Sequence, residues 1–264
     1  YGYEVPEQRA QETLKRFFQG PVNLLDTSRN YAMGESEKRI GIAIKENGGW
    51  PENFVLSTKI DRNMDTLVLD KKRTRESIEE SLKTLNVDSV DILFLHDPEY
   101  VKDVNDITKK DGALDELFKI KEEGLAKAVG LAMGKINIMF PLLKNWDFDV
   151  IINHNRYTLL NREADEMYSY AHSKNISIFN AAPYAGGVLA KGPSNFKKIT
   201  YQDATEEKLA PAKEIEKVCK KYNVEMGAAA LQFSMKDKRI TSTLCGVTSV
   251  QSIEKNLSWA NTNI

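Results

Sequence analysis

Short apolar runs alternate with longer amphipathic stretches along the whole chain. Seven short runs are rich in apolar and β-forming residues, as parallel strands covered on both faces require. They span residues 22–25, 54–58, 90–95, 126–131, 150–153, 176–180 and 241–245. Apolar positions three and four residues apart predict helices between and beside them; these span residues 6–19, 36–47, 74–85, 113–123, 136–143, 162–174, 211–222 and 226–236, with a last helix from about residue 249. Strands that alternate with such helices indicate βαβ units and a parallel α/β sheet.

This alternation has no linker in it, so we expect a single domain over residues 1–264. A doubly wound sheet would carry a glycine-rich turn after an early strand, but GxGxxG and the P-loop are both absent. A (β/α)8 TIM barrel has eight strands in about 250 residues. Because seven strands are found, we predict a barrel whose first strand precedes Tyr1, with roughly 20–40 residues absent in front.

Composition narrows the classes of partner. The 264 residues are 41% hydrophobic and 28% charged, and 37 Lys and Arg balance 38 Asp and Glu to a net charge of −1. We therefore expect no nucleic-acid partner, and no apolar run is long enough for a membrane span. Cys219 and Cys245 are too few for a disulfide scaffold or a zinc site, so we expect two buried thiols in a cytoplasmic protein and no metal. Oligomeric state is not determined by these features.

Polar groups follow three successive predicted strands. Asp26 ends one strand, Lys59 the next and His96 the third, and Tyr31 follows in the loop after Asp26. Each residue alone is most often a turn former, a solvated charge or a structural histidine. Because the carboxyl ends of barrel strands converge at one mouth, the four together predict a catalytic site.

These four residue types suit proton transfer at a carbonyl oxygen. A tyrosine is a weak acid with a pKa of about 10, and a neighbouring ammonium lowers the cost of its phenolate. A carboxylate keeps that ammonium charged, and a histidine can orient the substrate oxygen. The set contains no redox group, so a hydride step would need a cofactor.

The sequence resembles the aldo-keto reductase superfamily over nearly its whole length. The tetrad Asp26, Tyr31, Lys59 and His96 matches the family's signature, and residues 25–37 resemble its "DT…Y..G.SE" motif. The segments at residues 96–99 and 156–160 are most similar to those of the threo-aldose (L-fucose/L-galactose type) dehydrogenases. The resemblance implies a (β/α)8 barrel that binds NAD or NADP without a Rossmann motif. It also implies that Tyr31 is the general acid or base, that Lys59 paired with Asp26 depresses its pKa, and that His96 binds the substrate oxygen.

The same resemblance implies where the cofactor binds. The amide donor of the sixth strand aligns with His154, with Asn153 as the adjacent alternative, and only one of them is expected to point inward. Further cofactor contacts are expected from the backbone of the turn at Pro183, Tyr184 and Gly187, and from the adenosine-phosphate segment with Gly246, Thr248, Ser252 and Asn256.

The chain departs from the common family pattern at three points. Residues 130–134 offer no Ser-Asn pair for the carboxamide, and the aromatic that stacks on nicotinamide aligns with Ala181, which leaves Tyr184 as a possible substitute. Ser252 stands where NADP-preferring members often have arginine, so we expect NAD to be weakly favoured.

The expected activity is interconversion of a sugar lactol, aldehyde or ketone with its oxidised or reduced partner. Two alternatives are a Schiff-base barrel lyase that uses Lys59 and a non-catalytic nucleotide-sensing subunit. Polar loops at residues 61–70, 97–110 and 191–205 are expected to select the small-molecule substrate.

Overall fold

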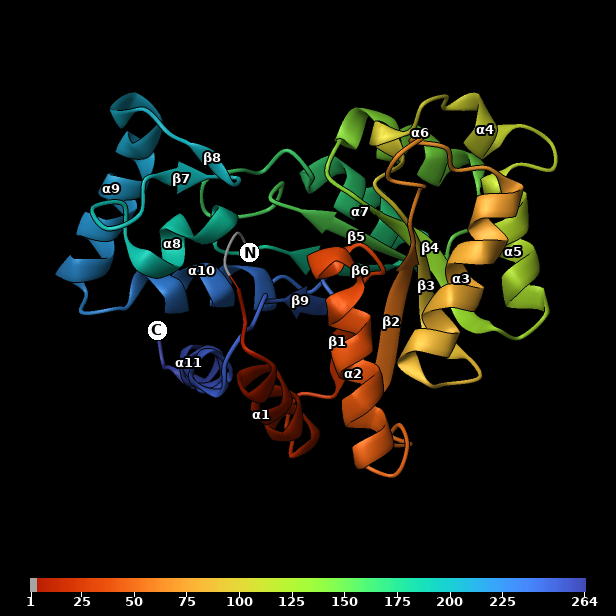
Figure 1. The fold of residues 1–264 in the computed structure, drawn as a ribbon. Coiled ribbons are helices and arrows are strands. Elements are labelled where there is room, and N and C mark those ends of the chain that lie inside the picture. Colours follow the sequence, from red (N-terminus) through yellow and green to blue (C-terminus); the bar gives the residue numbers. More distant parts are fainter. Residues whose placement is uncertain (1–3) are drawn as a thin grey trace. The chain divides into compact units, whose positions relative to one another are not determined.

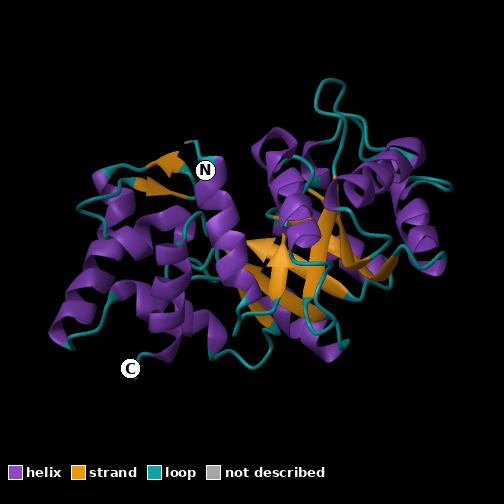
Figure 2. Ribbon diagram, turned by 60° about the horizontal axis from the view of Figure 1, so that its bottom comes forward, coloured by secondary structure: helices purple, strands orange, loops and turns teal. Residues whose placement is uncertain are grey.

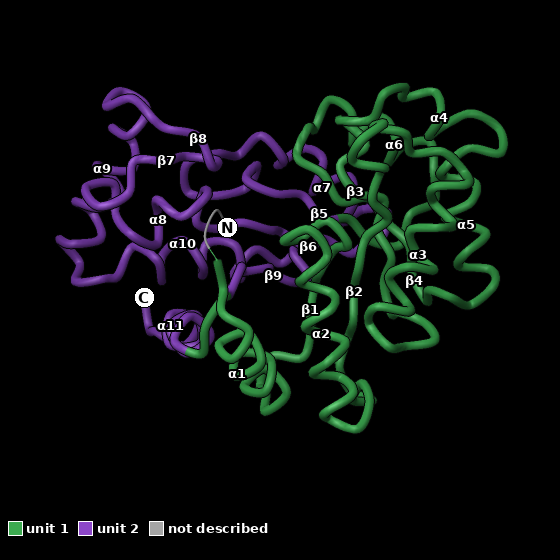
Figure 3. Tube along the Cα trace, in the orientation of Figure 1, with its two compact units in different colours: residues 1–151, 248–250 green, residues 152–247, 251–264 purple. Residues whose placement is uncertain are grey.

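The computed structural model describes residues 4–264 and follows the predicted alternation of helices and strands (Figure 1). Two compact units can be distinguished: residues 1–151 with 248–250 form unit 1, and residues 152–247 with 251–264 form unit 2 (Figure 3). Strand β5 (Val150–His154) begins in unit 1 and ends in unit 2. The single domain expected from the sequence stays a prediction.

Unit 1 is built from βα repeats. Its longer elements are α1 (Glu7–Phe18), β1 (Leu24–Asp26), α2 (Glu35–Glu46), β2 (Val55–Ile60), α3 (Lys71–Leu85), β3 (Val90–His96), α5 (Ala113–Glu122), β4 (Ala126–Met133) and α6 (Ile136–Asn145). Three short helices lie in its loops: η1 (Tyr31–Gly34), η2 (Pro98–Tyr100) and α4 (Asn105–Thr108). The strands follow the order β1-β2-β3-β4-β5, and β1 to β4 pair in parallel.

Unit 2 also combines helices and strands, as the chain does throughout (Figure 2). Its elements are α7 (Asp165–Ser173), β6 (Ser177–Ala181), η3 (Ala185–Gly187), α8 (Val188–Lys191), the hairpin β7 (Lys198–Ile199) and β8 (Gln202–Asp203), α9 (Glu206–Lys221), α10 (Met226–Met235), β9 (Ser242–Leu244) and most of α11 (Val250–Asn261). Here the strand order is β5-β6-β9, and β6 pairs with β9 in parallel.

Strand β2, which carries Lys59, is buried on both of its faces. All its residues from Leu56 to Ile60 are at most 1% exposed, so both of its faces are covered. On one side, α3 packs on the strand and Glu37 of α2 accepts a hydrogen bond from Thr58, while the other face carries Lys59. Gly130 of β4 is required for close packing, because a Cβ there would overlap the carbonyl oxygen of Val150.

All seven predicted strands are present, with ends shifted by one or two residues. Two helices begin earlier than predicted because polar side chains cap them. Asp70 accepts a hydrogen bond from the backbone of Arg73 at 2.8 Å and starts α3, and Thr205 starts α9 upstream of Pro211. Each capping side chain accepts a hydrogen bond from a first-turn amide that has no partner within the helix. The spacing of apolar residues alone does not reveal such a cap.

Candidate active site

The four predicted catalytic residues all lie in unit 1, at the carboxyl ends of its first strands. Asp26 ends β1, Lys59 is the next-to-last residue of β2, and His96 ends β3. Tyr31 opens η1, directly after the β1 loop. Parallel strands end at one edge of a sheet, so these residues converge as the sequence predicts.

Lys59 and Asp26 form a buried ion pair. Lys59 Nζ lies 2.6 Å from Asp26 Oδ2 and donates a second hydrogen bond to the carbonyl oxygen of Thr27 at 2.6 Å. The other carboxylate oxygen of Asp26 accepts a hydrogen bond from Ser57 Oγ at 2.7 Å. The Lys59 side chain is 1% exposed, so these contacts hold its ammonium in one position.

The ion pair also keeps the lysine charged. Burial by itself lowers the pKa of Lys59, because an ammonium is poorly solvated there. The charges and hydrogen bonds of Asp26 and Tyr31 outweigh that effect, so the pKa of Lys59 is raised above its ordinary value. The lysine therefore acts as a fixed positive charge throughout the physiological pH range.

Tyr31 stands between this charge and His96. Lys59 Nζ lies 4.7 Å from the centroid of the Tyr31 ring, and the rings of Tyr31 and His96 meet edge to face at 5.7 Å. Loss of solvation raises the pKa of the Tyr31 phenol, the charge of Lys59 lowers it, and the net shift is upward. Lys59 thus acts in the expected direction, but desolvation is the larger effect, and the phenol is protonated at neutral pH.

Asp61 is a further residue of this site, which the sequence placed only in a substrate loop. It is 1% exposed, and its Oδ1 lies 2.6 Å from Nδ1 of His96. Its Oδ2 accepts hydrogen bonds from Ser28 Oγ at 2.5 Å and from the backbone of Asn30 at 2.9 Å. Burial raises the pKa of Asp61, but His96, Ser28 and Asn30 overcome it, so the net pKa is lowered.

A simple signal could have found Asp61. It follows Lys59 by two residues, and side chains two apart along an extended chain lie on the same face. Its backbone is also held: Arg73 Nε donates to the Asp61 carbonyl oxygen at 3.1 Å, and Ser77 Oγ accepts from the Asp61 amide at 3.0 Å.

The two candidates at the end of β5 differ in burial. Asn153 is fully buried, whereas His154 is partly exposed. The side-chain nitrogen of Asn155 lies 3.2 Å from Nδ1 of His154. With that amide as donor, Nδ1 accepts and Nε2 carries the ring proton, so His154 can donate a hydrogen bond.

The turn at residues 183–187 uses several of its N–H groups internally. Pro183 is buried and has no N–H, and the amide of Gly187 donates to the Tyr184 carbonyl at 2.9 Å. The Ala185 amide likewise donates to Ala182 at 3.1 Å. Gly186 has a φ of +78°, and a Cβ there would lie 2.8 Å from the backbone nitrogen of Tyr201. These contacts give the glycine a packing role and leave fewer N–H groups for a pyrophosphate than expected.

Tyr184 lies beside the expected adenosine-phosphate segment. Its hydroxyl lies 2.5 Å from Oδ1 of Asn256, and its ring packs edge to face against Trp259 at 5.5 Å. These contacts hold Tyr184 next to Asn256, which does not fit the suggested stacking on nicotinamide. Because its carbonyl oxygen accepts from Tyr184, the Asn256 amide can present its NH2 to an acceptor such as an adenine ring nitrogen.

The remaining candidates lie around the start of α11. Gly246 is exposed, while Thr248 and Ser252 are half-buried. The nearby Lys255 donates to Glu225 Oε2 at 2.6 Å, and its ammonium lies 5.0 Å from the Trp259 ring. The positive charge closest in sequence to Ser252 is therefore already paired.

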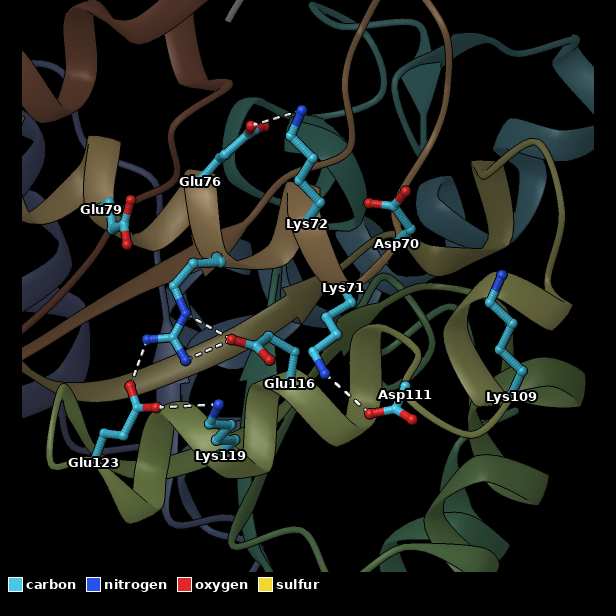
Figure 4. A pocket seen from close by; sticks show the side chains of 11 residues that line it. Asp70, Lys71, Lys72, Glu76, Glu79, Lys109, Asp111, Glu116, Lys119 and Glu123 are labelled. Carbon is cyan, nitrogen blue, oxygen red and sulfur yellow. Dashed lines mark hydrogen bonds and ion pairs between the residues drawn. The ribbon is translucent and has the colours of Figure 1, made fainter.

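A hollow lies elsewhere in unit 1, between α3 and α5 (Figure 4). Every lining residue is charged: Asp70, Lys71, Lys72, Arg75, Glu76, Glu79, Lys109, Asp111, Glu116, Lys119 and Glu123. The charges pair with one another, as in Lys71–Asp111 and Arg75–Glu116. It contains no tetrad residue, and we interpret it as a solvated helix surface.

Other features bear on cofactors and environment. Among residues 4–264, no group of three or more His, Cys, Asp or Glu side chains is arranged to hold a metal ion. Both cysteines are free; Cys219 is buried, and Cys245 is only partly so. In the same residues, no helix has the length and apolar character needed to span a bilayer.

Comparison with known proteins identifies the family. The aldo/keto reductase family model matches residues 2–264. The chain belongs to the aldo/keto reductase family. It is 29% identical to L-galactose dehydrogenase of Arabidopsis thaliana over 266 residues, covering 96% of this chain and 78% of that protein. It is 27% identical to D-threo-aldose 1-dehydrogenase of a Pseudomonas species over 280 residues, covering 96% and 84%.

The fold comparison agrees with the sequence. The holo form of an aldo-keto reductase from Bacillus halodurans superposes with a TM-score of 0.81 at 19% identity, covering 98% of this chain and 84% of that one. The predicted TIM-barrel fold class and the resemblance to threo-aldose dehydrogenases are thereby confirmed. Family membership makes this aldo/keto reductase an NAD(P)-dependent oxidoreductase.

Proposed function

We propose that this aldo/keto reductase interconverts a sugar lactol, aldehyde or ketone with its oxidised or reduced partner, and that Tyr31 transfers the proton. The observation that carries the proposal is the buried Lys59–Asp26 pair beside the Tyr31 ring. A fixed ammonium at that place stabilises the phenolate that forms when Tyr31 gives up its proton. The names of the two sugar dehydrogenases support the substrate class.

The roles of the residues follow from their protonation. A bound nicotinamide supplies or accepts the hydride. In reduction, Tyr31 gives its proton to the carbonyl oxygen as the carbon gains hydride; in oxidation, the phenolate takes the hydroxyl proton. Lys59 stays charged in both directions because Asp26 raises its pKa. His96, with a side chain 13% exposed, binds the substrate oxygen.

For the cofactor, two side chains are proposed as hydrogen-bond donors. His154 can donate to a carboxamide oxygen, and Asn256 can donate to adenine. A 2′-phosphate requires unpaired cations, preferably arginine. Ser252 offers none, and Lys255 is paired with Glu225. These observations favour NAD over NADP.

The lysine's charge argues against a Schiff-base lyase. Such an enzyme needs a neutral amine that can attack a carbonyl. Lys59 is instead held as an ammonium by Asp26 and Thr27, with a raised pKa. The same observation therefore supports proton transfer and disfavours nucleophilic catalysis.

A substrate screen with matched variants tests the proposal. Aldoses, pyridoxal and simple aldehydes are offered with each nicotinamide cofactor, and the change in nicotinamide absorbance is followed. We expect turnover of at least one sugar or aldehyde. Tyr31→Phe should lower kcat by about 100-fold or more while cofactor binding persists. Tyr222→Phe, at a tyrosine that is 67% exposed, is the control and should match wild type.

Three outcomes would count against the proposal. Cofactor binding without turnover of any substrate would favour the nucleotide-sensing alternative. Turnover in Tyr31→Phe at the wild-type rate would remove Tyr31 from the reaction. Trapping of substrate on Lys59 by borohydride would support the lyase instead.

A further inference from the structure

Two cationic side chains of unit 1 share one aromatic ring. Tyr100 lies in η2, just after strand β3, and its side chain is 50% exposed. The guanidinium carbon of Arg62 lies 5.6 Å from the centroid of the Tyr100 ring, and Nζ of Lys135 lies 5.1 Å from it. Arg62 follows β2 and Lys135 follows β4. Because β3 lies between β2 and β4 in the sheet, the two cations come to this ring from the strands on either side.

Neither cation has a carboxylate partner. Within residues 4–264, Arg62 and Lys135 form no ion pair. Arg62 is only partly exposed, and its Nε is shielded from solvent without a hydrogen-bond partner in that range. Partly buried arginines are usually paired, as Arg73 and Arg75 of α3 are with glutamates. The charges of Arg62 and Lys135 are therefore not used to hold the fold and are available to a ligand.

The carboxylates of the same loops face other groups. Glu99 Oε1 accepts hydrogen bonds from the backbone amides of the two residues before α6, at 3.0 and 3.3 Å. Asp97 Oδ2 lies 3.9 Å from Nε2 of His96. Asp61 binds Nδ1 of His96 and Oγ of Ser28. These three carboxylates therefore leave the two cations without a close counter-charge.

The two cations lie at the edge of the sheet that carries the tetrad. Arg62 directly follows Asp61, whose Oδ1 lies 2.6 Å from Nδ1 of His96. On the other side, His96 pairs in register with Ala132, and Lys135 follows in the loop after that strand. Loops at the carboxyl ends of barrel strands form the substrate site in enzymes of this fold. A substrate whose oxygen meets His96 can therefore extend toward Arg62 and Lys135.

We propose that Arg62 and Lys135 bind an anionic group, a phosphate or a carboxylate, that the substrate carries away from its reacting carbon. This inference rests on the proposed function, because it assumes that the reacting end meets Tyr31 and His96. The planar fork of a guanidinium matches two oxygens of either anionic group, and an ammonium adds a point charge. The face of the Tyr100 ring attracts cations and so holds two like charges near each other. The substrate class narrows to sugar phosphates, sugar acids and aldehydes with such a group.

Substrates that differ only in the anionic group test this inference. Galactose is compared with galactose 6-phosphate and with galacturonate, and glyceraldehyde with glyceraldehyde 3-phosphate. In the wild type, kcat/KM for at least one charged substrate should exceed that for its neutral partner about tenfold or more. Added salt should reduce this preference, because it screens the two cations. The phosphate and carboxylate arms show which anionic group the enzyme selects.

Variants of the two cations show whether they hold the anion. The ratio of kcat/KM for the charged substrate to that for the neutral one should fall about tenfold in Arg62→Gln. It should fall about threefold in Lys135→Gln, because exposed charges contribute less. Lys144→Gln is the matched control and should keep the ratio. It removes the same charge from another ring contact, with Nζ 3.9 Å from the Phe140 centroid, near the opposite end of α6.

Binding without turnover gives an independent readout. Glycerol 3-phosphate and glycerol are titrated into the enzyme by calorimetry at constant ionic strength with NADH present. NADH cannot reduce an alcohol, and it fills the cofactor's own phosphate-binding positions. Glycerol 3-phosphate should bind more tightly than glycerol. Its Kd should rise about tenfold in Arg62→Gln and stay the same in Lys144→Gln.

The two readouts separate this inference from the proposed function. Failure to turn over any substrate defeats the proposed function, whereas glycerol 3-phosphate binding that is weakened in Arg62→Gln still supports the inference. Equal kcat/KM values for charged and neutral substrates, or a preference for the neutral ones, overturn the inference and leave the proposed function in place. A preference for charged substrates that persists in both Arg62→Gln and Lys135→Gln also overturns it, because the anion is then held elsewhere.

Discussion

The hydroxyl of Tyr184 lies 2.5 Å from Oδ1 of Asn256, although the two residues are 72 positions apart in the chain. Tyr184 belongs to the turn before α8, and Asn256 lies in α11. The contact fixes which end of the Asn256 amide is free to donate. Under the proposed function, in which Asn256 binds the nucleotide, Tyr184 therefore supports that binding.

Removing that hydroxyl should weaken cofactor binding. In Tyr184→Phe the Asn256 amide loses its partner and can rotate, so the Kd for NAD should rise about three- to tenfold, which corresponds to one lost hydrogen bond of about 1 kcal/mol. Fluorescence titration or calorimetry measures this. Asn256→Ala should cost at least as much, and the double variant little more, because both changes remove one interaction. Unchanged affinity in Tyr184→Phe would show that the amide is held by other contacts.

The Lys255–Glu225 pair should influence the choice between NAD and NADP. Glu225→Gln leaves the Lys255 ammonium without its 2.6 Å carboxylate partner. The ratio of kcat/KM for NADP to that for NAD should rise about threefold, a small effect because both side chains are about half exposed. Glu214→Gln, which breaks the exposed pair with Lys217, is the control. A wild type that prefers NADP tenfold or more would contradict the expected NAD preference.

Oxidation and reduction should respond in opposite ways to pH. The pKa of the Tyr31 phenol is raised above its usual value of about 10, so below that pH most molecules hold the phenol proton. Reduction uses this proton and should decline only as pH rises through the pKa. Oxidation needs the phenolate, so its kcat should increase with pH, by up to about tenfold per unit. A kcat for oxidation that levels off near pH 7 would show that another group controls the step.

Loss of the Lys59 ammonium should reduce both stability and activity. Lys59→Met leaves the largely buried Asp26 carboxylate, 15% exposed, without its partner, which should cost about 3 kcal/mol in denaturant unfolding. It also removes the charge that lowers the pKa of Tyr31, so the pH profile of oxidation should move further upward. Adding Asp26→Asn to Lys59→Met should recover part of the stability but none of the activity. If the double variant is no more stable than Lys59→Met, the loss does not come from the unpaired carboxylate.

Sequence patterns predicted the strands and helices well where burial imposes a regular spacing of apolar residues. Strands such as β2 and β5 are covered on both faces, so each reads as an apolar run, and polar residues at the ends of three predicted strands form the tetrad cluster. The polar character of residues 61–70 predicts only a substrate loop there and does not single out Asp61. Its burial depends on contacts with Ser28 and His96, which lie 33 and 35 residues away along the chain.

The sequence also did not predict the hydrogen bonds within turns. The predicted phosphate-binding turn at residues 183–187 contains glycines, as expected, but the amides of Ala185 and Gly187 donate to the nearby carbonyls of Ala182 and Tyr184. Glycine content indicates that a backbone can adopt a positive φ, and it does not show which way the N–H groups point. The hairpin β7–β8 and the short helices were also missed, because elements of two to four residues have no detectable period.

The buried ion pair of Lys59 has a consequence for chemical reagents. Its ammonium donates to Asp26 and to the Thr27 carbonyl oxygen, and lies 4.7 Å from the centroid of the Tyr31 ring. Because the amine stays protonated, it has no lone pair to offer to an electrophile. Acylating or aldehyde reagents that label the exposed lysines of this enzyme should therefore spare Lys59, and an inhibitor designed for this site gains nothing from a group aimed at it.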